Sequence, residues 1–190
     1  MARRHLTAIT LFPILALAPA CTTSPGDPAE PAAATERSTQ PASDAAPPPR
    51  TQAWMDRLTV PHHYDPSTGF IVADRVTPLP DLFTQTEPAE AVRRADQTNA
   101  TAVLVATADR CAPCQQYKLD ALNNPAVLDK LRAGPFTAAH IEVDTRPELA
   151  DRLLGSRAIP VTYALRDGRV IATLPGQRSP EDLLAWLDSL

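Results

Sequence analysis

Two cysteines three residues apart, Cys111 and Cys114, constrain this chain more than any other feature of its sequence. They follow a short apolar run without charge, residues 101–106, which is typical of a strand buried on both faces. The segment after them, residues 115–122, lacks Gly and Pro and is predicted to be a helix. Cys111 would then stand at a helix N-terminus, where unpaired backbone N–H groups and the helix dipole favour an anion. An anion on sulfur is a thiolate, the nucleophile of disulfide exchange, so the pattern predicts a redox-active dithiol.

The cysteine pair could also form a purely structural disulfide or half of a zinc site. A disulfide between residues only three apart removes little entropy from the unfolded chain, which argues against the structural role. Zinc needs two further ligands, and only His140 and the neighbouring His62 and His63 are available. His62 and His63 would point to opposite faces of an extended segment, so we interpret them as part of a surface loop and expect no metal site.

A second motif lies downstream, at Ala158-Ile159-Pro160-Val161-Thr162. Together with Cys-Ala-Pro-Cys between a strand and a helix, it makes residues 84–190 resemble the thioredoxin superfamily. The resemblance implies an α/β thioredoxin fold, a mixed central β-sheet with helices on both faces, and a cis peptide bond before Pro160. It implies that Cys111 attacks a disulfide and that Cys114 resolves the mixed disulfide. It also implies substrate contacts from Pro160, Ile159, Ala112 and Pro113, and no cofactor other than the redox-active Cys111–Cys114 disulfide.

The hydrophobic pattern by itself predicts the same order of elements. Helices are expected at residues 87–98, after Asn124, from Thr145 to Gly155 and after Ser179. Strands are expected at residues 101–106 and 137–143, and at 161–165 and 170–174 on either side of an Asp167-Gly168 hairpin turn. After the first helix the order is β-α-β-α-β-β-α, with a parallel crossover and then an antiparallel hairpin.

Three residues around the cysteines depart from the thioredoxin pattern. Arg110 stands where Trp is usual, Gln115 where Lys is common, and Val105 where thioredoxins bury an acid. Without that acid, the sequence shows no evident proton acceptor for Cys114. Arg110 could stabilise the Cys111 thiolate or could be an exposed loop residue, and both possibilities stay open. Residues 108–111, Ala-Asp-Arg-Cys, resemble the Ala-Asp-Trp-Cys segment in the periplasmic C-terminal domain of a transmembrane thiol reductant transporter.

The first 53 residues carry signals of export and anchoring. Residues 1–20 combine Arg3 and Arg4, a short apolar run and the small-residue ending Ala-Pro-Ala, as a bacterial signal peptide does. The following Cys21 resembles the lipidated cysteine of a lipobox. Residues 21–53 are rich in Pro, Ala, Ser and Thr and predict a disordered tether. We therefore expect a periplasmic or otherwise extracytoplasmic lipoprotein, anchored to a membrane.

Residues 54–83 form an N-terminal extension with no assigned role. A strand is expected at residues 69–73 after a turn at 66–69.

The net charge of the chain and the two residues between the cysteines limit the functions to be expected. A formal net charge of −4 argues against nucleic-acid binding, and the chain is expected to be a monomer. Ala112 and Pro113 offer the Cys111 thiolate neither charge nor side-chain donor, so a thioredoxin-like potential and a reductant role are expected. Its partners would be disulfide-containing or dithiol proteins and a membrane electron donor. A non-catalytic binding module and a copper or zinc handling protein are the alternatives.

Overall fold

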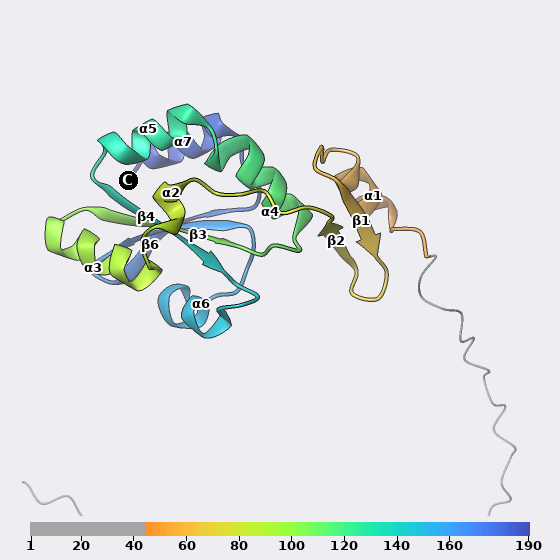
Figure 1. Cartoon of the computed structure of the whole chain (residues 1–190), viewed down its shortest axis with the longest axis horizontal. Coiled ribbons are helices and arrows are strands. Elements are labelled where there is room, and N and C mark those ends of the chain that lie inside the picture. The colour runs from red at the N-terminus through yellow and green to blue at the C-terminus, as the bar shows by residue number, and fades with distance from the viewer. Residues whose placement is uncertain (1–44) are drawn as a thin grey trace, which may run out of the picture. The chain divides into compact units, whose positions relative to one another are not determined.

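The computed structural model describes residues 45–190, and a four-stranded mixed sheet forms its centre (Figure 1). The strand order is β4-β3-β5-β6, with β3 parallel to β4 and antiparallel to β5, and β6 antiparallel to β5. This is the expected parallel crossover followed by a hairpin, so the predicted thioredoxin fold is confirmed. The strands are β3 (Thr101–Thr107), β4 (Phe136–Glu142), β5 (Val161–Arg166) and β6 (Arg169–Pro175).

The central strand β3 is buried along its whole length and supplies both layers of the core. Its alternate side chains point to opposite faces, as the pleat requires. Ala102, Leu104 and Ala106 pack with residues of α3 and α6, whereas Val103 and Val105 pack with residues of α4, α5 and α7. The sheet is therefore covered by helices on both faces. The helices are α2 (Asp81–Thr84), α3 (Pro88–Thr98), α4 (Ala112–Tyr117), α5 (Pro125–Ala133), α6 (Pro147–Leu154) and α7 (Pro180–Asp188).

Local sequence signals fix most of the helix ends and the hairpin. The side chains of Asn124 and Ser179 accept the N–H groups of Ala126 and Asp182 and so cap α5 and α7. In the β5–β6 turn, Asp167 and Gly168 both have positive φ, 52° and 66°, as a tight two-residue hairpin needs.

Two helical details differ from the sequence-based expectation. The Cys-containing helix is α-helical only to Tyr117 and continues as a π-helical segment, η2 (Lys118–Leu122). Helix α6 begins at Pro147 rather than at Thr145, and the Thr145 hydroxyl donates to the Glu142 carbonyl instead of capping the helix.

The N-terminal extension is more structured than its sequence predicts. It begins at α1 (Pro49–Met55), whose first residues lie in the range expected to be tether, so the extension spans residues 49–83. It also contains an antiparallel pair, β1 (His62–Asp65) and β2 (Phe70–Ala73). Strand β2 was expected, but β1 replaces the loop expected at His62 and His63.

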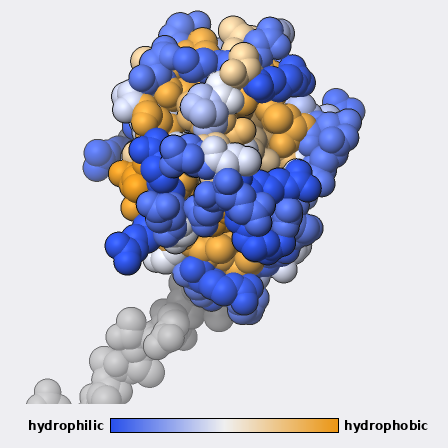
Figure 2. Space-filling model, turned by 90° about the vertical axis from the view of Figure 1, so that its left-hand side faces the viewer, coloured by the Kyte–Doolittle hydropathy of each residue, from blue (hydrophilic) through white to orange (hydrophobic). Residues whose placement is uncertain are grey.

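The extension lies beside α4, at one end of the domain (Figure 1). Figure 2 shows the opposite end, where α3 lies, as a mostly hydrophilic surface with small separate hydrophobic areas. None of the helices between residues 45 and 190 is both long and apolar enough to cross a membrane.

Candidate functional site: the Cys111–Cys114 pair

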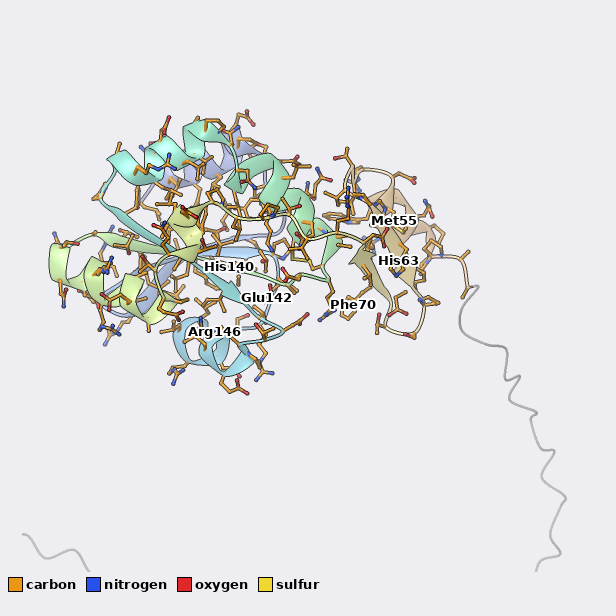
Figure 3. The ribbon with its side chains drawn as sticks, in the orientation of Figure 1. Met55, His63, Phe70, His140, Glu142 and Arg146 are labelled. Atoms are coloured by element: carbon orange, nitrogen blue, oxygen red, sulfur yellow. A yellow bond between two sulfur atoms is a disulfide. The ribbon has the colours of Figure 1, made fainter. Side chains whose placement is uncertain are left out.

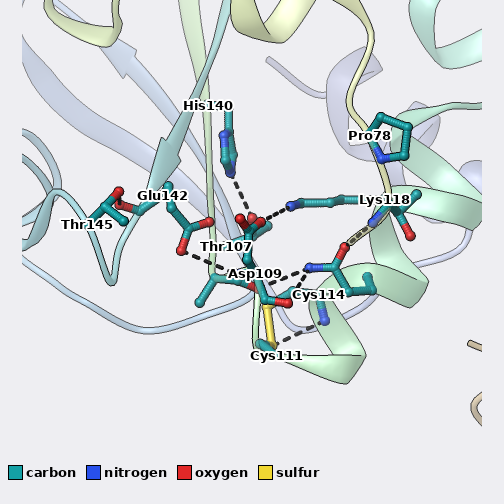
Figure 4. Close-up of polar contacts among 12 residues, drawn as sticks. Pro78, Thr107, Asp109, Cys111, Cys114, Lys118, His140, Glu142 and Thr145 are labelled. Carbon is teal, nitrogen blue, oxygen red and sulfur yellow. Dashed lines mark hydrogen bonds and ion pairs between the residues drawn. A yellow bond between two sulfur atoms is a disulfide. The ribbon is translucent and has the colours of Figure 1, made fainter. Parts of the chain in front are cut away.

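The two cysteines are joined as a disulfide at the start of α4, with their Cα atoms 5.1 Å apart. Cys111 is the N-cap residue of this helix, and its Sγ accepts a hydrogen bond from the Cys114 backbone N–H over 3.2 Å (Figure 4). Cys111 is partly exposed, whereas Cys114 is fully buried. An external disulfide can therefore approach Cys111 but not Cys114.

The loop before β5 lies next to this disulfide. Its Ile159–Pro160 peptide bond is cis. Ile159 lines the same cavity as Cys111, while Pro160 is buried and its carbonyl accepts the Gly176 N–H over 2.8 Å. Of the two residues that were expected to meet a substrate here, Ile159 is the accessible one.

The residues between the cysteines have different environments. Pro113 is partly exposed and lines the cavity beside Cys111. Ala112 is fully buried and packs with Leu58 and Val60 of the extension. Ala112 was expected to contact substrate, and the structure shows that the extension covers its methyl group.

Arg110 is an anchoring residue at this site. Its guanidinium donates to both oxygens of Asp144, over 2.6 and 3.1 Å, which raises the pKa of Arg110. The guanidinium also lies 4.8 Å from the ring centre of Phe70, within the range of a cation–π contact. Because Asp144 neutralises this charge, Arg110 has little left with which to stabilise a Cys111 thiolate.

Two glutamines of α4, one of which also departs from the thioredoxin pattern, hold the extension in place. The buried Gln115 accepts the Thr77 N–H over 2.7 Å and donates to the carbonyl of Asp109 over 3.0 Å. Its neighbour Gln116 accepts the N–H groups of Thr59 and Val60, over 2.7 and 3.1 Å. Sequence reasoning missed both roles, since nothing local marks a partner 38 to 57 residues away.

The extension also reaches the cysteine loop through its backbone. Val72 of β2 forms an antiparallel bridge with Cys111, and the Ala73 N–H donates to the Arg110 carbonyl over 2.8 Å. The extension is therefore part of the site and not a separate tail.

A polar cluster stands on the α4 face of the sheet, where thioredoxins have their buried acid. Val105 pairs with His140 in the β3–β4 register, so the acid position is apolar and its neighbour is a histidine. His140 Nε2 lies 2.7 Å from the Thr107 hydroxyl oxygen. Burial and, to a smaller extent, the charge of Lys118 lower the pKa of His140 to about 4, so the ring is neutral at pH 7.

Lys118 and Asp109 complete the cluster on the side of the cysteines (Figure 4). The Lys118 side chain is only 3% exposed, and its ammonium lies 3.1 Å from the Asp109 carboxylate. Since Asp109 is two residues from Cys111, this ion pair places a buried positive charge close to the dithiol loop.

Glu142 is a carboxylate that the sequence pattern does not single out. It lies at the end of β4 and on the same face as His140, because both alternate with the oppositely facing Ile141. Its Oε1 accepts the Asp109 N–H over 3.1 Å, and its Oε2 is buried without a hydrogen-bond partner among residues 45–190. Burial raises the pKa of Glu142, which makes it a candidate proton acceptor beside the site.

Both histidines of β1 already have hydrogen-bond partners close by in the extension. His62 Nδ1 lies 2.7 Å from the Val60 carbonyl oxygen, and His63 Nδ1 lies 2.6 Å from an Asp74 carboxylate oxygen. Within residues 45–190, no three His, Cys, Asp or Glu side chains are grouped so that they could hold a metal ion.

The expected signal peptide, Cys21 and most of the tether lie outside the described residues.

The sheet order, the helix-capping disulfide and the adjoining cis-proline loop together define a protein of thioredoxin fold with a redox-type cysteine pair. Comparison with known families agrees with this definition, because residues 88–190 match the thioredoxin-like domain family. The chain belongs to that family.

Individual relatives are more distant. An uncharacterized protein of Mycobacterium tuberculosis and one of Mycobacterium bovis are each 27% identical over 122 residues, or 62% of this chain. The chain spans 38% of the length of these curated relatives. A thioredoxin from Thermus thermophilus is 26% identical, with 53% of this chain and 81% of that one covered and a TM-score of 0.46. The Drosophila melanogaster thioredoxin Deadhead is 22% identical, with 57% of this chain and 97% of that one covered and a TM-score of 0.43.

Proposed function

We propose that the protein is an extracytoplasmic thiol–disulfide oxidoreductase that reduces disulfides in exported proteins. The observation that carries this proposal is the asymmetry of the cysteine pair, with a partly exposed Cys111 at a helix N-terminus and a fully buried Cys114. A dithiol of this kind accepts a substrate at one sulfur and keeps the other for the second step.

The reaction follows from that asymmetry. The Cys111 thiolate attacks one sulfur of the substrate disulfide, a new S–S bond forms, and the other substrate sulfur leaves as a thiolate. Cys114 then loses its proton and attacks Cys111 Sγ, which releases the second substrate thiolate. Two electrons have moved to the substrate, its two thiolates take up two protons, and the Cys111–Cys114 disulfide remains.

The surroundings of Cys111 favour electron flow from the protein to its substrate. Ala112 and Pro113 carry no charge, and Arg110 is neutralised by Asp144. The groups that can stabilise the Cys111 thiolate are the helix N-terminus, the Cys114 N–H and the buried Lys118, whose charge is shared with Asp109. These favour a moderately lowered thiol pKa and hence a reductant rather than a strong oxidant.

The extracytoplasmic setting is supported by the first 20 residues, whose sequence resembles a bacterial export signal and is followed by Cys21. A reductant in an oxidising compartment must itself be reduced again. We therefore include in the proposal a membrane-embedded dithiol donor, beside which a lipid anchor at Cys21 would hold the domain.

Turnover of a protein disulfide tests the proposal. The protein, reduced again after each cycle by dithiothreitol, is expected to accelerate insulin reduction, and Cys111→Ser is expected to abolish the effect. Cys114→Ser is expected to accumulate mixed disulfides through Cys111, which mass spectrometry detects. Trapping through Cys114 in the Cys111→Ser variant would reverse the two roles.

Two measurements distinguish the alternative functions, a non-catalytic binding module and a metal handling protein. A protein that binds insulin but never reduces it would be a non-catalytic binding module. Copper or zinc that copurifies in a one-to-one ratio, and that is lost in Cys111→Ser, would indicate a metal handling protein.

A further inference from the structure

A cavity of about 770 Å³ opens beside Cys111, and the extension builds one of its walls. The opposite wall comes from the thioredoxin-like domain, with Pro113 and Ile159 next to the sulfur. The wall of the extension includes Trp54 of α1 and the Gly69–Ile71 end of the hairpin. Residues 49–73 therefore turn the surface around Cys111 into a two-walled site.

The wall of the extension presents a backbone edge to this cavity. The Asp74 N–H bonds to the Pro61 carbonyl, so within the antiparallel pair Tyr64 and Ile71 face each other as a non-hydrogen-bonded pair. The backbone groups of Ile71 therefore point away from β1, as do those of Ala73, which bonds to Arg110. The cysteine loop already pairs with the Val72–Ala73 part of this edge, through the Val72–Cys111 bridge and the bond from Ala73 to Arg110. The part left for a partner is the short Gly69–Ile71 end, which lines the cavity.

The side chains of this wall are apolar and aromatic. Trp54 is 43% exposed and Phe70 is 52% exposed, both unusually open for such large apolar side chains. Phe70 lies between the hairpin and the body of the domain (Figure 3), where Arg110 holds its ring. Exposed aromatic side chains along one wall of a groove are typical anchors for an apolar side chain of a partner.

The charged side chains that line the cavity carry a net positive charge. Arg110 is paired with Asp144, and Arg157 is paired with Asp151. Arg50 also lines the cavity and takes part in no ion pair among residues 45–190. A carboxylate of a bound partner is therefore the complementary charge at that end.

We propose that the extension is a substrate-selecting wall, which admits to Cys111 an extended polypeptide segment whose disulfide cysteine is flanked by an apolar residue and an acidic one. The segment lies extended along the Gly69–Ile71 end of the hairpin, its apolar side chain rests on Trp54 and Phe70, and its carboxylate faces Arg50. This inference rests on the proposed oxidoreductase function and names its substrate class. A small disulfide would use neither the edge nor the aromatic wall.

The test compares two synthetic twelve-residue peptides, each with one internal disulfide, with bis(2-hydroxyethyl) disulfide. One peptide has Leu and Glu beside its cysteine, and the other has Ser and Lys at the same positions. The fully reduced chain is mixed with each probe, and the rate constant is measured from the thiols released. The Leu/Glu peptide is expected to react at least fivefold faster than the Ser/Lys peptide.

Variants then test whether the wall formed by the extension causes the preference for the Leu/Glu peptide. Trp54→Ala/Phe70→Ala is expected to lower the ratio of the Leu/Glu peptide rate to the small-disulfide rate at least fivefold. Arg50→Glu is expected to lower the ratio of the Leu/Glu peptide rate to the Ser/Lys peptide rate. Ile171→Ala, which changes a 48% exposed residue of β6 outside the cavity, is expected to keep both ratios within twofold of the parent protein. Thermal unfolding verifies that each variant is folded.

The outcomes separate the two proposals. Equal rates for the two peptides, or an unchanged ratio in the double variant, would overturn the selecting wall while leaving the oxidoreductase function intact. Failure to reduce any of the three disulfides, the small one included, would overturn the oxidoreductase function and this inference with it.

Discussion

The backbone N–H of Ala73 donates to the carbonyl oxygen of Arg110 over 2.8 Å, and so joins the N-terminal extension to the residue that precedes Cys111. Neighbouring contacts strengthen the junction, since Val72 bridges Cys111 and Phe70 lies under the Arg110 guanidinium. Any movement of the extension must therefore alter the surroundings of Cys111.

The first prediction concerns the attachment of the extension. Gln116→Ala removes the acceptor of the Thr59 and Val60 N–H groups, and Val60 is buried. An unpaired buried donor costs about 1 to 3 kcal/mol, so amide exchange at Thr59 and Val60 should accelerate by one to two orders of magnitude, about 10- to 100-fold. Gln97→Ala, at an exposed position of α3, serves as the control and should leave these rates unchanged. Unaltered protection in Gln116→Ala would show that the extension is held by other contacts.

The second prediction concerns the buried charges beside the dithiol. Replacing Glu142 with Gln removes a negative charge and should lower the pKa of the Cys111 thiol, whereas Lys118→Met removes a positive charge and should raise it. The pH dependence of iodoacetamide alkylation of the reduced protein measures both. Shifts of the same sign in the two variants would contradict this electrostatic account.

If Glu142 also accepts the proton of Cys114, then Glu142→Gln should slow the second step of exchange. In a single-turnover experiment, release of the second substrate thiol should slow about 10-fold, while formation of the mixed disulfide stays within about twofold. Equal effects on the two steps would instead point to a structural defect.

The third prediction concerns pH and stability. His140 has a pKa of about 4 in the folded state and about 6.5 when unfolded, so the unfolded chain binds the extra proton between these values. The His140 contribution to the free energy of unfolding is therefore full above pH 6.5 and is lost progressively as the pH falls to 4. The loss amounts to about 3 kcal/mol.

Urea unfolding from pH 4 to pH 7 measures this change. His140→Asn, which can still bond to the Thr107 hydroxyl, should flatten the profile across the interval. The NMR titration of the His140 ring should show a midpoint near pH 4. A midpoint near 6.5 would mean that the ring is solvated and would remove the effect.

The fourth prediction concerns the reduction potential. With no charged residue between the cysteines, the Cys111–Cys114 couple should lie near the thioredoxin value of about −270 mV. Equilibration with dithiothreitol or glutathione buffers, followed by alkylation, gives the value. A potential above about −180 mV, that of a disulfide isomerase, would exclude the reductant role.

The fifth prediction concerns anchoring and tests the sequence of the first 21 residues. Cys21→Ser should move the exported protein from the membrane fraction to the soluble fraction, because acylation at that sulfur would be lost. Immunoblotting of the two fractions measures the change. Recovery of the parent protein in the soluble fraction after export would refute the lipid anchor.

The sequence by itself determined the features that depend on neighbouring residues. The all-apolar β3, the Asp167-Gly168 turn, the Asn124 and Ser179 caps and the pairing of Cys111 with Cys114 are all local, because propensity, capping and short spacing act within a few residues. The β-α order follows from these signals and from the handedness of crossovers.

Only the tertiary structure decided how the extension meets the site. Gln116 bonds to Thr59 across 57 positions, and Arg110 bonds to Asp144 across 34. A polar side chain has many possible partners, and its choice depends on which surfaces the core brings together, so no local pattern predicts it. For the same reason, the sequence offered Ala112 as a substrate contact, whereas packing against Leu58 and Val60 buried it.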